Sequence, residues 1–189
     1  MKKIFLIAAT AILTFTASAQ NIKFAHVNYS ELVQLMPEAD AARQKLAAQS
    51  KEFEQTYQDM AAEFQNKLTQ YQQKASTWTA AIKDSKEKEL NDIQTRLQEF
   101  QQTAQGEMQQ QQQELMAPIQ KKAQEAVAKL AKEGGYIYVF EETSLLYIDK
   151  AQSIDLTPAA RKALNIPDSR TIESLQAELH AQQQQQTHN

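Results

Sequence analysis

Apolar residues along most of this chain recur at steps of three and four, the spacing that places them on one face of a helix. Between Pro37 and Glu133 there is only one further proline, Pro118, and one glycine, Gly106. Two apolar series flank the polar stretch KDSKEKE at 83–89. The first is Leu46, Phe53, Tyr57, Met60, Phe64, Leu68, Tyr71, Ala75, Trp78 and Ile82, and the second is Leu90, Ile93, Leu97, Phe100, Ala104, Met108, Leu115, Ile119, Ala126 and Leu130.

This arrangement predicts a long antiparallel helical hairpin over 38–133 with its tip at 83–89, because two amphipathic helices bury their seams against each other. Facing residues in such a hairpin have a constant sum of residue numbers. Pairing Ile82 with Leu90 gives 172, which also pairs Phe53 with Ile119 and Phe64 with Met108. The register therefore predicts contact between Phe64 and Met108.

The segments on either side of the hairpin alternate and are rich in β-branched and aromatic residues. They predict a strand over 22–29, followed by a short helix over 31–36, and a β-hairpin formed by 136–141 and 145–149. Thr157 and Pro158 then begin a short helix that ends at Leu164. The predicted fold is thus mainly α, with a small three-stranded β body built from 20–37 and 134–165.

About 50 residues of body are too few for a stable core without disulfides or metal. The strands are apolar on both faces, so we expect other copies of the chain to complete the sheet. The candidate oligomerisation residues are Phe24, Val27, Tyr136, Tyr138, Phe140, Leu146 and Ile148.

A two-helix arm cannot enclose large side chains completely, and an apolar strip left on a soluble surface usually marks a binding site. The candidate binding strip consists of Met60, Phe64, Tyr71, Trp78, Leu97 and Phe100. Trp78 has two interpretations that the sequence leaves open. Its ring packs across the hairpin near Ile93 and Gln94, or part of it stays exposed and contacts a bound chain.

The first 19 residues predict a secretory signal peptide, with a positive start at Lys2 and Lys3, an apolar run and an Ala-Ser-Ala cleavage site before Gln20. Without those two lysines the 20 basic residues become 18 against 23 acidic ones, so the mature net charge is −5. An acidic mature chain argues against general nucleic-acid binding. The absence of cysteine means that packing or assembly must supply stability.

Catalytic patterns are absent from the sequence. The three histidines, His26, His180 and His188, lie in a predicted strand and in the polar tail, without metal-ligand spacing. There is no phosphate-binding glycine loop or nucleophile elbow. We therefore expect neither an enzyme nor a metal site. The Gln-rich tail, 166–189, is predicted to be mostly disordered, with a weak helical pattern at Ile172, Leu175 and Leu179.

The order of elements and two stretches, IKFAHVNYSEL at 22–32 and GGYIYVFEETSLLYIDKAQSIDLT at 134–157, resemble the Skp/OmpH family of periplasmic chaperones. The resemblance covers roughly 21–164. It implies a homotrimer in the periplasm of a Gram-negative bacterium, whose strands form a central β-barrel and whose helical arms surround a cavity. It further implies that unfolded outer-membrane β-barrel proteins are held there without ATP or metal, with transient contact to membrane surfaces. Members of the family are strongly basic, whereas this chain has a pI of about 5.7.

Two functions follow as hypotheses. The first is an ATP-independent holdase that keeps outer-membrane proteins from aggregating. The alternative is a structural coiled-coil adaptor in the cell envelope, which would carry a distinctive tip motif and a larger β domain. The plain Lys/Glu/Asp tip and the short β segments favour the holdase.

Overall fold

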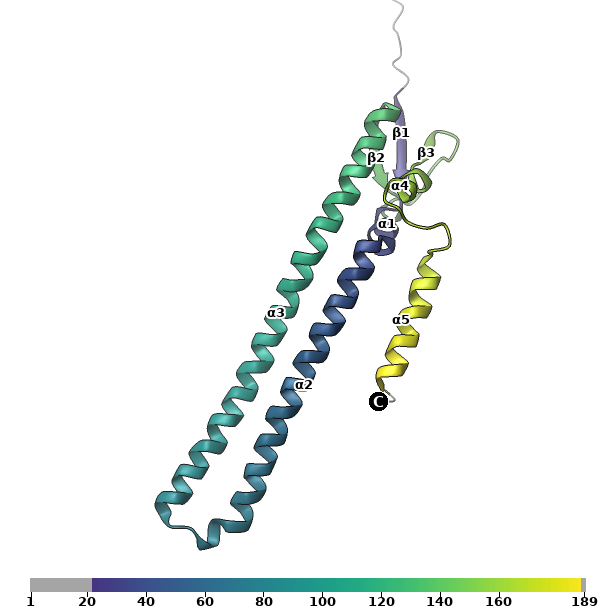
Figure 1. Cartoon of the computed structure of the whole chain (residues 1–189). Coiled ribbons are helices and arrows are strands. Elements are labelled where there is room, and N and C mark those ends of the chain that lie inside the picture. Colours follow the sequence, from purple (N-terminus) through teal and green to yellow (C-terminus); the bar gives the residue numbers. More distant parts are fainter. Residues whose placement is uncertain (1–21, 188–189) are drawn as a thin grey trace, which may run out of the picture.

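The computed structural model describes residues 22–187, so the predicted signal peptide and its cleavage site lie outside the described residues. A small body of strands and short helices sits at one end of a long two-helix arm (Figure 1). In chain order the elements are β1 (Lys23–Val27), α1 (Tyr29–Leu35), α2 (Pro37–Lys74), a 3₁₀ turn (Ala75–Thr77), α3 (Ala80–Gly134), β2 (Tyr136–Glu141), a 3₁₀ turn (Glu142–Ser144), β3 (Ser153–Asp155), α4 (Thr157–Ala163) and α5 (Ile172–Thr187). The prediction of a mainly helical protein with a small three-stranded sheet is confirmed.

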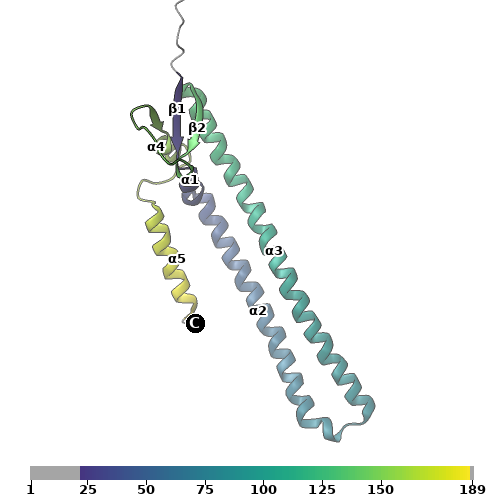
Figure 2. The ribbon, with the colours of Figure 1, turned by 180° about the vertical axis from the view of Figure 1, so that it is seen from behind.

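The arm consists of α2 and α3, which lie side by side and run in opposite directions (Figures 1 and 2). The large residues of both predicted apolar series are buried or half-buried, except Ile82, which is exposed. The periodicity therefore located the buried stripe of each helix, as the 3.6-residue repeat requires.

The tip of the arm lies at 75–79 rather than at 83–89, so the predicted tip is wrong. The stretch KDSKEKE belongs to the first turns of α3, because lysine and glutamate are good helix formers and need no apolar partner. Ser76, Thr77 and Thr79 form the real turn, and the Thr79 side chain accepts a hydrogen bond from the Ile82 amide at 3.4 Å. Ser and Thr favour such cap positions over helix interiors.

Because the tip lies earlier in the chain than predicted, the register between α2 and α3 also differs from the predicted one. The Phe53 and Phe100 rings meet edge to face with centroids 6.0 Å apart. The ion pairs between α2 and α3 join Lys67 to Glu89, Glu63 to Arg96 and Glu38 to Lys122. These residue numbers sum to between 153 and 160 rather than to 172. Phe64 therefore lies about 14 residues, or about 20 Å, away from the level of Met108, and their predicted contact is wrong.

The sheet is parallel throughout, with the strand order β2-β1-β3, so the predicted β-hairpin is wrong. Because α3 continues 12 residues beyond Lys122, it passes the start of α2 by about 18 Å and reaches the beginning of β1. There the Lys23 ammonium donates to the Gly134 carbonyl at 3.3 Å. Gly135 ends the helix with φ of 68°, a left-handed conformation suited to glycine, and β2 then runs beside β1 in the same direction.

The segment 145–149, predicted as a strand, contains no strand residue. The third strand is instead Ser153–Asp155, which pairs with the other edge of β1. This strand could not be predicted from the sequence, because three residues with one apolar side chain are too few to show an alternating pattern.

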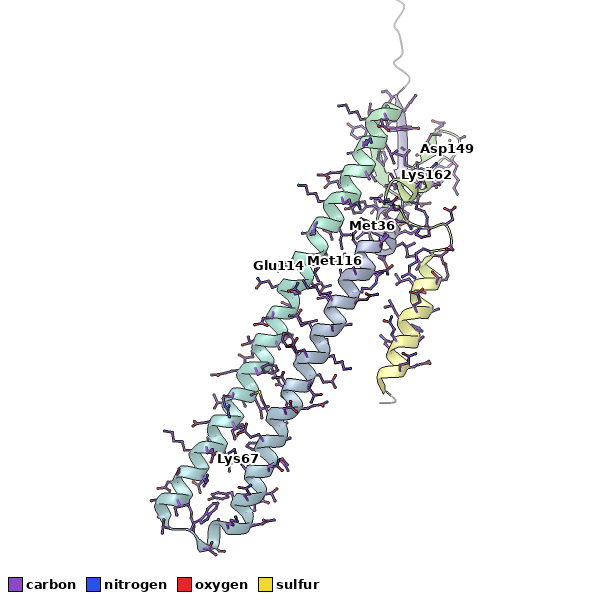
Figure 3. The ribbon with its side chains drawn as sticks, in the orientation of Figure 1. Met36, Lys67, Glu114, Met116, Asp149 and Lys162 are labelled. Carbon is purple, nitrogen blue, oxygen red and sulfur yellow. The ribbon has the colours of Figure 1, made fainter. Side chains whose placement is uncertain are left out.

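The core of the body lies where α1, the start of α2, the second half of α3 and α4 meet the sheet. Met36, labelled in Figure 3, joins α1 to α2 and is fully buried there. Its neighbours in the buried cluster are Ala25, Val27, Leu32, Val33, Leu35, Ala39, Ala42, Ile119, Ala123, Leu156, Ala160, Leu164, Ile166 and Leu175. One continuous core thus fastens the arm to the body.

The tail is ordered over most of its length, which contradicts the prediction of disorder. Residues 172–187 form α5, beside the first part of α2 (Figures 1 and 2). The weak pattern at Ile172, Leu175 and Leu179 is the face that packs: Leu175 is buried, and the other two are partly buried against the core. The prediction of disorder gave more weight to the polar composition of the tail than to the helical spacing of these three apolar residues.

The arm register predicts energetic coupling between Phe53 and Phe100. In a double-mutant cycle with Phe53→Ala and Phe100→Ala, we expect a coupling energy of about 0.5–1.5 kcal/mol, because an edge-to-face pair contributes that much beyond burial. Urea unfolding followed by far-UV circular dichroism measures it. The matched cycle with Phe53→Ala and Ile119→Ala should show no coupling. Coupling of Phe53 to Ile119 and not to Phe100 would instead support the register predicted from the sequence, in which facing residue numbers sum to 172.

Candidate functional site: two incompletely buried apolar surfaces

One surface is an aromatic face on the sheet. Phe24 on β1 and Tyr138 and Phe140 on β2 project from the same side, since alternate strand residues share a face. The Phe24 ring lies 6.4 Å from each of the other two ring centroids, which lie 5.9 Å from each other. These side chains are 38%, 59% and 41% exposed. Such a cluster, left in contact with water, is typical of a surface that another chain covers.

Other apolar side chains of the body are also exposed. They are Ile22, Ile137, Leu145, Leu146, Tyr147 and Ile154. Among them, only Leu146 belongs to the predicted oligomerisation set. The alternating pattern of a strand predicts which residues share a face, but it does not predict which of these residues a helix of the same chain covers. The remaining predicted members divide: Tyr136 and Ile148 are half-buried, and Val27 is 3% exposed within the chain's own core.

Both outer strands of the sheet have one unpaired side within the described chain, since β1 alone lies between two partners. Open strand edges offer backbone groups for pairing with another chain. The aromatic face and the two edges occur on the same small sheet. The body therefore presents both apolar area and backbone hydrogen-bonding capacity to a neighbour.

The second surface is the apolar seam of the arm. All six predicted members of the binding strip, Met60, Phe64, Tyr71, Trp78, Leu97 and Phe100, are half-buried. Five of them line the contact between α2 and α3, Trp78 lies at the tip, and part of each side chain stays in water. No sheet or third helix covers this length of the arm within the described chain (Figure 1).

Trp78 lies in the turn at the tip, not opposite Ile93. Its ring meets Tyr71 edge to face, with centroids 5.8 Å apart, and it stays half-exposed. Ile93 is instead buried in the seam. The predicted packing partner is wrong, since Trp78 packs on Tyr71 and not on Ile93; contact of its exposed part with a bound chain stays a prediction.

Charged residues bracket the seam near the tip and fix the two helices in register. Glu89 on α3 pairs with Lys67 on α2 and with Lys86 one turn earlier, and Lys67 is labelled in Figure 3. The hydrogen bond from Lys67, followed by that from Lys86, lowers the pKa of the Glu89 carboxyl to about 2. At the base of the arm, the hydrogen bond from Lys122 lowers the pKa of Glu38. The ion pairs thus flank the apolar strip rather than interrupt it.

His26 is buried in the body, and its Nδ1 lies 2.8 Å from the Ser153 hydroxyl. It joins β1 to β3 through this hydrogen bond. In the part of the chain that the structure describes, no group of three His, Cys, Asp or Glu side chains could hold a metal ion. None of the described helices combines the length and the apolar character needed to cross a membrane.

A long two-helix arm stands on a small parallel sheet, and both carry incompletely buried apolar surface of the kind that usually marks a binding site. The family model of OmpH-like outer membrane proteins matches residues 23–164. The chain belongs to this family, and the resemblance drawn from its sequence is confirmed.

The fold is similar to the crystal structure of a candidate OmpH-like outer membrane chaperone from Caulobacter crescentus CB15, with a TM-score of 0.69. The sequences are 12% identical, and the similarity covers 76% of this chain and 84% of the other. A comparison with curated proteins found no match.

The lowered pKa of Glu89 predicts a pH-dependent contribution to stability. Replacing Glu89 by Gln should lower the melting temperature at pH 7, because both lysines lose their partner. Since the folded pKa of about 2 lies below the ordinary value of 4.5, this difference should persist above pH 4.5 and shrink as the pH falls to 2. Thermal unfolding of both proteins across that range measures it. Glu99→Gln, on the exposed face of α3, is the control; an equal pH dependence there would contradict the assignment.

Proposed function

We propose that this protein is an ATP-independent holdase of the periplasm, which binds unfolded outer-membrane β-barrel proteins along its arms and prevents their aggregation. Membership of the OmpH-like family supports a chaperone role in general. The similar Caulobacter crescentus protein is described as an outer membrane chaperone, which agrees with this proposal.

The observation that carries the proposal is the half-buried seam. From Phe53 to Tyr71 of α2, about 27 Å, no third element of the described chain covers it. An unfolded chain presents apolar segments at many places along its length. A long, shallow strip can contact several of them weakly at once, and linked weak contacts add to a strong overall affinity.

Release then needs no nucleotide. A client that folds into a membrane buries its apolar segments there, and the free energy of that folding exceeds the sum of the shallow contacts. A deep pocket would hold a client too specifically for this exchange, whereas half-exposed side chains exchange readily.

We further propose that three copies assemble through the sheet. The aromatic face and the unpaired sides of β2 and β3 support assembly, since they are apolar and hydrogen-bonding surfaces that a monomer leaves in water. The number three comes from the family resemblance. Three arms around one axis would enclose a client from several sides.

Apolar contact, rather than charge, is proposed to hold the client. The chain has a pI of about 5.7, and the cations near the seam are already paired with acidic residues. Client affinity should therefore change little between about 50 and about 500 mM salt, because only Coulombic attraction between exposed charges is screened.

The holdase proposal predicts that the seam binds the client. A urea-unfolded outer-membrane β-barrel protein, diluted into the mature protein, should stay soluble, as measured by light scattering. Met60→Ser with Phe64→Ser should weaken client binding roughly tenfold, since apolar area on both side chains is lost. Asn66→Ser, on the exposed face of α2, is the matched control, and circular dichroism verifies that the arm remains helical. Aggregation at the same rate with and without the unaltered protein would defeat the proposal.

The assembly proposal predicts that Tyr138→Ser with Phe140→Ser dissociates the oligomer and leaves the helices intact. Both side chains lie on the aromatic face, and they make few contacts with the chain's own core. Analytical ultracentrifugation gives the mass, and circular dichroism gives the helix content. Ile82→Ser, at an exposed position in the first turn of α3, should leave the mass unchanged. A monomeric mass for the unaltered protein at micromolar concentration would disprove assembly.

A further inference from the structure

The C-terminal helix α5 lies beyond the residues that the family model covers, which end at 164. It nevertheless occupies a defined place: it runs beside the base of α2, and Leu175 enters the buried core (Figure 1). An added segment that covers the base of the arm affects how much of the arm is available to bind another chain.

Few apolar side chains dock α5. Leu175 is buried, Ile172 and Leu179 are partly buried, and the residues from 180 to 185 are exposed. The polar second half of α5 therefore adds little apolar contact with the arm.

A cleft of about 740 Å³ remains between α5 and the base of α2. Leu35 of α1 and Pro37 and Ala47 of α2 line one wall, Leu175 and Leu179 line the other, and charged and amide side chains of both helices complete the lining. The backbone of α5 packs closest to α1, and the cleft separates the rest of α5 from α2. A groove with apolar residues on α2 is covered by α5 but not filled by it.

The polar contacts at this junction can be exchanged without leaving a buried charge. The Arg170 guanidinium, at the start of α5, contacts Asp40 of α2 at 2.7 Å and Glu178 at 2.5 Å. Asp40 has a second partner, Arg43, on its own helix. If α5 moves away, Asp40 keeps Arg43, and Arg170 and Glu178 enter water. Breaking a charge pair is costly mainly when one partner stays buried and alone.

We propose that α5 is a displaceable cover of a peptide-binding groove at the base of α2. The ligand that replaces it is an unfolded segment with two apolar side chains spaced like Leu175 and Leu179. This inference depends on the proposed holdase function, because the ligand is the client. The groove adds a binding site at the base of the arm to the strip along its length, and α5 sets the affinity of that site by competition.

The test locks the cover in place. The chain contains no cysteine, so Ala47→Cys with Gln182→Cys places the only two thiols on opposite walls of the cleft. A short bismaleimide bridges them, and the same double variant capped with N-ethylmaleimide is the control. The probe is a fluorescently labelled, urea-unfolded eight-stranded outer-membrane β-barrel protein, diluted into each form.

We expect the bridged form to bind this probe at least fivefold more weakly than the capped form. Saturating probe should also slow the bridging reaction, because a displaced α5 carries its thiol away from α2. Leu175→Ser, which removes the main anchor, should bind the probe more tightly, with Gln176→Ser as its exposed control.

Equal affinities of the bridged and capped forms, together with probe binding by the unaltered protein, would overturn the displaceable cover and leave the holdase proposal standing. If neither the unaltered protein nor any variant binds the probe, the holdase proposal fails, and this inference fails with it. A bridge that joins two chains, seen as a doubled mass on a denaturing gel, would show that α5 covers a second copy and would also overturn it.

Discussion

The register in which α2 packs against α3 decides where the other elements of this protein lie. With Phe53 against Phe100 and Glu38 against Lys122, α3 extends well past the start of α2. The chain consequently leaves the arm beside the first residue of β1, and β2 has to run parallel to it. Had the two helices been equal in length, the chain would have returned at the far end of β1 and an antiparallel pair would have been the natural outcome. The parallel pairing of β1 and β2 therefore follows from the greater length of α3.

The body and the arm share one feature, which is that their apolar side chains are incompletely buried. A pair of helices leaves the outer edges of its seam in water, and a three-stranded sheet leaves one aromatic face uncovered. In most proteins both surfaces would be closed by further layers of structure. In the assembly and function that we propose, the missing layers are a neighbouring copy of the chain and an unfolded client. The same lack of a complete core thus accounts for assembly and for binding.

The C-terminal helix is the exception, because it covers part of the arm from within the same chain. Its apolar contacts come from Leu175, Leu179 and Ile172 rather than from a continuous apolar face, and Arg170 lies between two carboxylates. A helix attached in this way is stable enough to be ordered, and weak enough to compete with a passing segment of similar apolar spacing.

The sequence by itself determined the helical arm, its buried stripe, the first strand and the family, since each depends on local periodicity or on motifs within a short span. Only the tertiary structure decided the tip, the register and the parallel sheet. The stretch at 83–89 illustrates the reason: its lysines and glutamates fit a loop or a helix equally well, and cross-arm partners such as Lys67 decide between them. Likewise Ser153–Asp155 becomes a strand only because β1 offers it an open edge, and α5 is ordered only because a core receives Leu175. Such contacts join residues far apart in the chain, and no local pattern records them.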